Sequence, residues 1–181
     1  MTILQLEVMD MSFKLTWRSQ VICILISLAL VIIMYSVVDS ILFKYFVQGF
    51  LDLKYAYIEF VISISLLMIP VTIVHEAVHG AAYKLFGGKV RFGFKGIYAY
   101  TQEISGKAIV RAKFLIVLLS PLVVISVLSL LLPTWLGGMV FLLNLLGASG
   151  DIYMSLYLCK FGKDSKIIDR KYGFDVLNSN H

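Results

Sequence analysis

The hydrophobic residues of this chain are gathered into a few long runs. Residues 19–38 contain no charged side chain and are bounded by Arg18 and Asp39. Residues 60–83 are apolar apart from two histidines and a glutamate, and residues 114–150 carry no charge over 37 positions. A helix needs about 20 apolar residues to cross the roughly 30 Å hydrocarbon layer of a membrane. Each of the first two runs therefore predicts one membrane-spanning helix.

The third run is too long for a single crossing, because a helix of that length would extend about 55 Å. Pro133, followed by Thr134 and Trp135, is the natural interruption, since proline has no N–H to donate to the helix. The run and the residues after it predict two further spans, over 114–132 and 135–158.

The basic loop over 87–113 has a different periodicity. Apolar and polar residues alternate along it on both sides of a Lys-Gly pair that can turn the chain. This pattern predicts a short amphipathic hairpin at the cytoplasmic interface. The alternating apolar residues are Val90, Phe92 and Phe94 before the pair, and Tyr98 and Tyr100 after it.

The composition supports a membrane domain. Hydrophobic residues make up 60% of the chain and charged residues 15%, with a mean hydropathy of +0.90, whereas soluble domains average about 25% charged residues. A disordered chain is excluded, and a nucleic-acid partner is not indicated, because the basic residues stand between apolar runs. We predict an α-helical membrane protein with a single domain over 1–181, about four transmembrane helices, a short cytoplasmic-side β-hairpin-like loop and a cytoplasmic tail over 160–181.

Lysine and arginine are distributed unequally between the two sides of such a domain. With four spans, the N-terminal arm, the basic loop and the tail share one side. That side carries fourteen Lys and Arg residues, against two on the other. Because loops rich in Lys and Arg stay in the cytoplasm, both termini are expected to be cytoplasmic, with the lipid bilayer as the surrounding partner.

The second apolar run contains the motif H-E-A-V-H, formed by His75, Glu76 and His79. Ionisable groups inside a span are costly and therefore indicate function. Residues four apart lie on one helix face, so the two imidazoles can bind one Zn²⁺. Glu76 stands beside the first ligand, where it can act as general base on a water activated by the metal. The alternative is a polar cluster without metal.

A catalytic zinc ion usually has a third protein ligand, and two residues are candidates. Asp151 lies nine residues before Lys160, just as His75 lies nine residues before Lys84. In regular helices both would lie about 13 Å inward from the same membrane face. Glu103 is the other candidate, but it stands in a polar, turn-like stretch and is expected to be solvated. A buried aspartate needs a partner, which favours Asp151.

Asn144 lies seven residues before Asp151, on roughly the same helix face. It can donate a hydrogen bond to a substrate carbonyl or its oxyanion, which would make it a catalytic residue beside Glu76. It can equally form an interhelical hydrogen bond, which is common in membranes. The sequence leaves these two roles open.

The order of these features resembles the site-2 protease class of intramembrane metalloproteases. An H-E-x-x-H helix is followed by a basic loop, a span with Ser120-Pro121, and a span with an asparagine and a later aspartate. More closely, the chain resembles a family of small bacterial membrane proteins described as zincin peptidases, over about residues 56–160. The resemblance implies His75, His79 and Asp151 as zinc ligands, Glu76 as general base, and Asn144 as the asparagine of the later span. It departs at Gly150-Asp151-Ile152, where site-2 proteases usually have Leu-Asp-Gly.

These observations predict a zinc-dependent, membrane-embedded endopeptidase of a bacterial plasma membrane, which hydrolyses peptide bonds of membrane-associated proteins or peptides. The alternative is a non-catalytic membrane protein, such as a metal-binding chaperone, a transporter component or a degenerate protease. A transporter would need a polar path through the bilayer, whereas the polar groups here fall in one layer near the cytoplasmic side. This confinement favours the enzyme.

Overall fold

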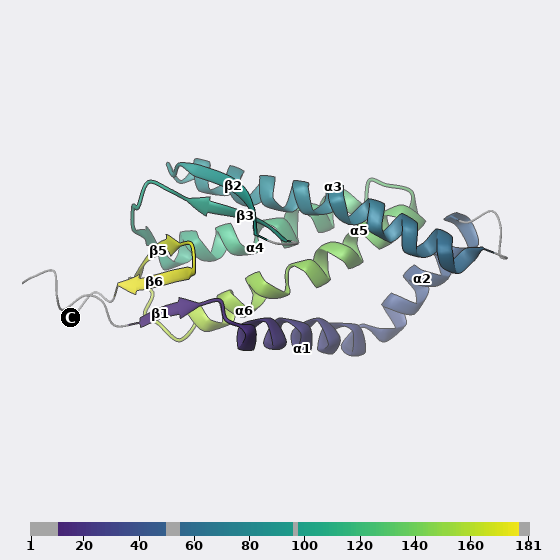
Figure 1. The fold of residues 1–181 in the computed structure, drawn as a ribbon, viewed down its shortest axis with the longest axis horizontal. Coiled ribbons are helices and arrows are strands. Elements are labelled where there is room, and N and C mark those ends of the chain that lie inside the picture. The colour runs from purple at the N-terminus through teal and green to yellow at the C-terminus, as the bar shows by residue number, and fades with distance from the viewer. Residues whose placement is uncertain (1–10, 50–54, 96–97, 178–181) are drawn as a thin grey trace, which may run out of the picture.

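A computed structural model of the protein describes residues 11–49, 55–95 and 98–177. It shows an elongated body of helices with the strands gathered at one end (Figure 1). The third helix packs against the fourth. The first helix packs against the sixth, and the second packs against the fifth. The helices are α1 (Trp17–Ile33), α2 (Tyr35–Gly49), α3 (Ala56–Leu85), α4 (Arg111–Ser129), α5 (Thr134–Gly147) and α6 (Ser149–Leu158).

Two of these helices are long and apolar enough to cross a membrane, namely Tyr57–Leu85 within α3 and Arg111–Ser129, which is α4. The pairs α1–α2 and α5–α6 meet the same criterion only if each bent pair is counted as one span. The described residues therefore contain two to four candidate spans. The predicted run 60–83 lies inside α3, and the predicted run 114–132 overlaps most of α4.

The segment predicted as one span over 19–38 is divided between two helices, because α1 and α2 meet at an angle of 83° around Met34. No glycine or proline stands at this bend. The two helices instead follow different neighbours, since α1 packs on α6 whereas α2 packs on α5. There Ile41 lies against Gly138, and the buried Tyr45 donates a hydrogen bond to Ser63 at 2.6 Å. Tertiary packing, not a helix-breaking residue, accompanies the change of direction.

The helix predicted over 135–158 is also divided. α5 ends at Gly147 and α6 begins at Ser149, with an angle of 46° between them. Gly147 and Gly150 flank the break, and glycine is the least favourable residue for a helix interior after proline. The bend is small enough for α6 to continue along the body toward the end that carries the strands (Figure 1).

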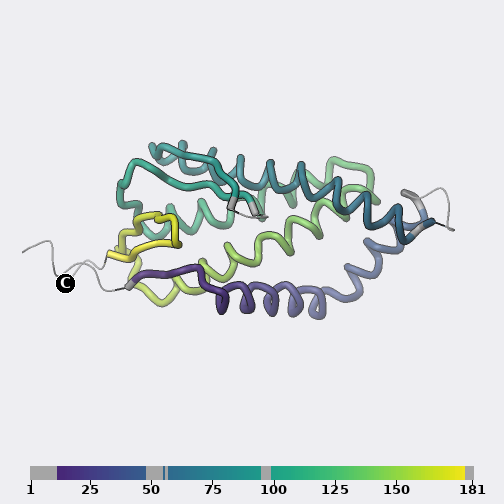
Figure 2. The backbone as a smooth tube through the Cα atoms, in the orientation of Figure 1, coloured from purple at the N-terminus to yellow at the C-terminus, as the bar shows by residue number. Residues whose placement is uncertain are grey.

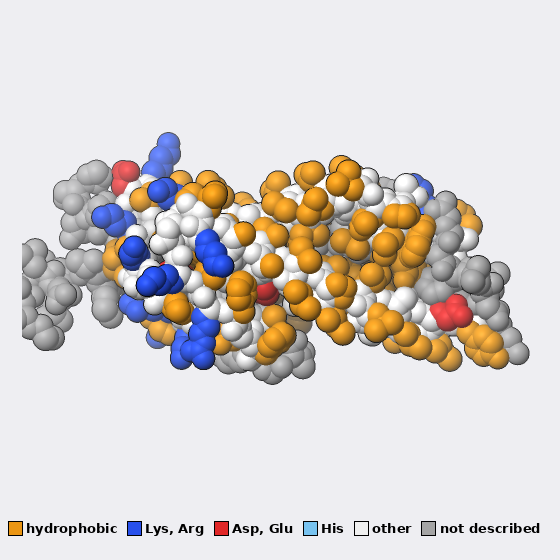
Figure 3. Space-filling view, turned by 90° about the horizontal axis from the view of Figure 1, so that it is seen from above, with side chains coloured by type: hydrophobic (Ala, Val, Ile, Leu, Met, Phe, Trp, Pro, Cys, Tyr) orange, Lys and Arg blue, Asp and Glu red, His pale blue; other side chains and the backbone are white. Residues whose placement is uncertain are grey.

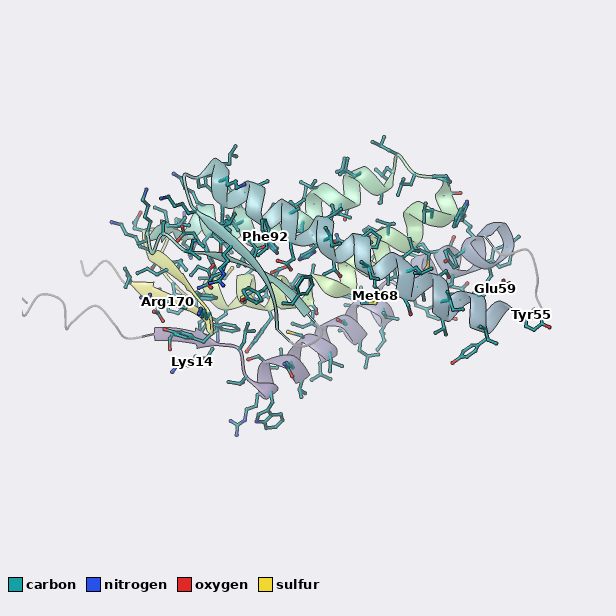
Figure 4. All side chains as sticks on the ribbon, turned by 45° about the horizontal axis from the view of Figure 1, so that its top comes forward. Lys14, Tyr55, Glu59, Met68, Phe92 and Arg170 are labelled. Carbon is teal, nitrogen blue, oxygen red and sulfur yellow. The ribbon has the colours of Figure 1, made fainter. Side chains whose placement is uncertain are left out.

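The hairpin predicted in the basic loop is confirmed. β2 (Val90–Lys95) pairs antiparallel with β3 (Tyr98–Glu103), while residues 96–97 at the predicted turn lie outside the described part of the chain. The hairpin packs on α3, where the ring of Phe92 covers Gly80 so closely that a Cβ there would lie 2.6 Å from the ring. The hydroxyl of Thr101 donates to the backbone carbonyl of Glu76 at 2.8 Å. Figure 4 labels Phe92 on the hairpin.

A second sheet, which we did not predict from the sequence, joins the two ends of the described chain. The tail over 160–181 supplies two of its four strands. The strands pair antiparallel in the order β1 (Met11–Lys14), β6 (Gly173–Leu177), β5 (Lys166–Arg170) and β4 (Ile109–Val110). The N-terminal and C-terminal strands therefore lie at the same end of the molecule (Figure 2).

This sheet has a well-packed apolar core of its own. The ring of Phe13 stacks on that of Phe174 at 5.1 Å, and the buried side chains of Phe114 and Leu158 connect the sheet to α4 and α6. Outside the core, lysine and arginine side chains gather at the sheet end, whereas hydrophobic side chains cover much of the remaining face (Figure 3). Lys14 and Arg170 mark the sheet end and Glu59 the opposite end (Figure 4).

Candidate metal centre

Three side chains of the predicted site meet in the interior between α3 and α6. His75 and His79 lie one turn apart on α3, and Asp151 lies in the first turn of α6. One carboxylate oxygen of Asp151, Oδ2, lies 3.0 Å from Nε2 of His75 and 3.4 Å from Nε2 of His79. The two Nε2 atoms are 3.2 Å apart. The side chains of the three residues are only 9–12% exposed.

The hydrogen bonds of Asn144 define the tautomer of His75. The amide nitrogen of Asn144 donates to the carbonyl of Pro121 at 3.2 Å, so its amide oxygen faces Nδ1 of His75 at 3.0 Å. Since that oxygen can only accept, Nδ1 carries the proton and Nε2 of the neutral ring has a free lone pair. Zinc-binding histidines characteristically donate their other ring N–H in this way.

A proline defines the tautomer of His79. Nδ1 of His79 lies 2.9 Å from the carbonyl of Val117 in α4, which can only accept. In a regular helix this carbonyl would accept from the residue four positions later, but that residue is Pro121, which has no N–H. Pro121 thus frees the Val117 carbonyl for His79, and the hydroxyl of Ser120 shares it at 2.8 Å. The sequence interpretation missed Val117, although the position four residues before a proline in a predicted helix could have indicated it.

The donor set fits a zinc ion. Two imidazole lone pairs and one carboxylate oxygen face one another within 4.8 Å, an arrangement of mutually repelling acceptors that a divalent cation stabilises. A tetrahedral zinc ion with bonds of about 2.0–2.1 Å holds its donor atoms about 3.3 Å apart. The observed separations of 3.0, 3.2 and 3.4 Å agree with that value. The position of Asp151 also agrees with the depth expected from the spacing along the helices.

Glu76 lies beside this cluster but is not part of it. Its neighbour His75 points into the cluster, whereas Glu76 shares a helix face with Gly80 and Tyr83, next to the hairpin. The residue is half-buried, and its carboxylate makes no hydrogen bond or ion pair with any residue that the structure describes. The Glu76 carboxylate is therefore not committed to a partner among the described residues.

Glu103, the alternative third ligand, lies elsewhere. The expectation that it is solvated is wrong, because the residue is 2% exposed. Its two carboxylate oxygens accept from the backbone N–H groups of Lys89, Ser105 and Gly106 at 2.9–3.1 Å. Burial alone would raise the pKa of Glu103, but these hydrogen bonds outweigh it and hold the pKa below its usual value. Glu103 closes the base of the hairpin and does not face the cluster.

Asn144 engages the cluster through His75. It is 1% exposed, and its oxygen and one amide hydrogen are used by His75 and Pro121. Only its second amide hydrogen is left for donation to a substrate, the other role that the sequence allowed.

We expect Asn144→Ala to weaken zinc binding about 10–100-fold, because His75 loses the acceptor that orients its ring. Competition with a fluorescent zinc chelator measures the affinity. Asn144→Asp keeps an oxygen acceptor for His75 but loses the hydrogen bond to the Pro121 carbonyl, so it should retain more zinc affinity than Asn144→Ala. Equal loss of affinity in both variants, with thermal stability unchanged, would contradict an orienting role.

No curated protein and no solved structure matches this chain significantly. A family model matches residues 68–166, which are more than half of the chain. The matched range includes the three residues of the cluster, together with Glu76 and Asn144. A zincin is a zinc peptidase, so the family name implies the same cofactor as the geometry of the cluster. The chain belongs to this family, whose description is "Putative zincin peptidase".

Proposed function

We propose that this protein is a zinc-dependent, membrane-embedded endopeptidase that hydrolyses peptide bonds of membrane-associated proteins. The observation that carries the proposal is the pair of histidine Nε2 atoms directed at Asp151, inside a helix long enough and apolar enough to span a membrane. Each histidine is oriented by an acceptor on a different helix, α4 or α5. A simple polar cluster would not require both rings to present Nε2 toward a carboxylate.

The location of the cluster supports action at the membrane. His75 lies ten residues before the end of α3, which corresponds to about 15 Å of helix. Large exposed side chains follow the same helix outward, including Leu66, Ile69 and Ile73, which are 56–63% exposed. Such a surface is suited to lipid rather than water. The basic residues at the sheet end match a cytoplasmic face, so we place the cluster in the cytoplasmic half of the membrane.

The chemistry divides between the cation and the residues around it. When bound, zinc polarises the scissile carbonyl and makes water more acidic. His75, His79 and Asp151 would hold it, while Asn144 and Val117 keep the two rings in position. Glu76 takes the proton of the attacking water and returns it to the leaving amine. The hairpin beside Glu76 has a strand edge that pairs with no other strand in the described part of the chain, and an extended substrate segment can lie along it.

Removal of zinc should abolish turnover. The probe is a quenched fluorogenic peptide with a membrane-spanning segment of about 20 apolar residues, co-reconstituted with the protein in lipid vesicles. A membrane-permeant zinc chelator should reduce the rate to background, and added Zn²⁺ should restore it. The non-chelating isomer of the same compound is the control.

Turnover that persists after the zinc has been removed, as verified by elemental analysis, would overturn the proposal. Cleavage of a soluble unfolded protein but not of the membrane-spanning peptide would contradict the membrane substrate while leaving the peptidase intact.

A further inference from the structure

A side chain of the C-terminal tail lies at the junction between the hairpin and the helix of the metal centre. Asp169 belongs to β5, and its Oδ2 accepts the backbone N–H of Glu103 at 2.7 Å and the hydroxyl of Tyr83 at 3.1 Å. Glu103 is the last residue of β3, and Tyr83 lies one turn after His79 on α3. A single oxygen atom therefore joins three elements.

We propose that Asp169 is a positioning residue through which the C-terminal strands hold the hairpin against the helix that carries His75 and His79. This inference builds on the proposed function, in which the hairpin borders the path of the substrate. Asp169 lies beyond residue 166, where the match to the family model ends, so the family match does not imply this anchor.

The other contacts of the hairpin leave room for such an anchor. Toward its tip, the hairpin is held by Phe92 over Gly80 and by the Thr101 hydroxyl on Glu76, but Phe92 remains 52% exposed. At its base, the Glu103 side chain binds backbone groups of the hairpin and its own loop, not the helix. At the base of the hairpin, the hydrogen bonds of Asp169 connect β3 with α3 through β5.

The junction also places two carboxylates close together. The groups that face Asp169 are Tyr83 from α3, Glu103 from β3 and the backbone N–H of Arg170 on its own strand. Burial raises the pKa of Asp169 to about 6, and the charge of Glu103 acts in the same direction, whereas the hydrogen bonds from Glu103 and Tyr83 act against it.

Attachment of the hairpin depends on pH because the pKa of Asp169 differs between the attached and the detached states. When the hairpin detaches, Asp169 becomes solvated and its pKa returns toward 3.8. The attached state therefore binds the proton more tightly, so attachment is strongest below the lower pKa and weakens as the pH rises through about 6. Between pH 5 and pH 7.5 the equilibrium for detachment should increase about tenfold.

Amide hydrogen exchange of the full-length protein in detergent tests this directly. We expect the protection of the hairpin amides, corrected for the intrinsic effect of pH, to fall about tenfold from pH 5 to pH 7.5 in the wild type. Asp169→Asn keeps an oxygen that can accept both hydrogen bonds but cannot ionise, so its protection should show no such fall. Asp164→Asn is the matched control, because Asp164 is an exposed aspartate of the same end of the molecule, and it should behave as the wild type.

A second variant distinguishes the loss of a hydrogen bond to Asp169 from a general loss of stability. Tyr83→Phe removes one donor and leaves the other bond of Asp169 intact, so hairpin protection should drop at every pH while the pH dependence remains. An identical pH profile in the wild type and in Asp169→Asn would overturn the proposal, as would unchanged hairpin protection in both variants. Because exchange does not require turnover, this result stands even if the protein proves not to be a peptidase.

Discussion

Asp151→Asn should leave a folded protein that no longer retains zinc. Asparagine has the size of aspartate but lacks its charge, and its amide can donate to a histidine Nε2, which satisfies the cluster without a cation. Loss of one of three protein ligands should weaken zinc binding by more than about 100-fold. Elemental analysis of the purified protein should show about one zinc per chain in the wild type and almost none in the variant.

Glu103→Gln provides the matched comparison, since Glu103 is the other acidic residue that the sequence offered as third ligand. It should retain zinc, because the Glu103 carboxylate binds backbone N–H groups of the hairpin and not the cluster. Retention of zinc by Asp151→Asn together with its loss from Glu103→Gln would show that the ligand assignment is wrong. Thermal unfolding of both proteins checks that the fold is intact.

Glu76→Gln should retain zinc but lose about 10²–10⁴-fold in turnover, which is the usual contribution of a general base. Glutamine is isosteric with glutamate and cannot accept a proton from water at neutral pH. The substitution removes no metal ligand, since Glu76 is not one of the three residues that form the donor set. The fluorogenic membrane peptide measures the rate, and elemental analysis verifies the zinc content.

Glu59→Gln is the control for this experiment. It makes the same substitution on the same helix, but at the opposite end of the molecule from the strands (Figure 4). Its turnover and its zinc content should equal those of the wild type. If cleavage continued at the wild-type rate in Glu76→Gln, another group would have to accept the proton and the proposed mechanism would fail.

The agreement between sequence and structure at the cluster has a simple geometric origin. The nine-residue intervals from His75 to Lys84 and from Asp151 to Lys160 run mainly along regular helix, in which each residue advances a constant 1.5 Å. The bend between α5 and α6 comes before Asp151, so it did not disturb the second interval. His75 and Asp151, which the spacing predicts at equal depth, therefore lie in contact.

Where the prediction failed, distant segments of the chain were involved. The bend at Met34 follows the packing of α2 on α5, and no residue at the bend itself breaks a helix. The tail formed strands because β6 pairs with β1 from the other end of the chain, about 160 residues away. Glu103 was expected in water, but it is covered because the loop folds around it.

By itself, the sequence determined the apolar runs, the alternation of the hairpin and the placing of His75 and His79 on one helix face, because these depend on helix and strand periods within a few residues. Only the tertiary structure decided that Asp151, and not Glu103, completes the donor set, and that Asn144 and Val117 direct both Nε2 atoms toward it. It also decided that Asp169 reaches the hairpin. The physical reason is that a helix period says which residues share a face, but which faces meet depends on packing between elements far apart in the chain.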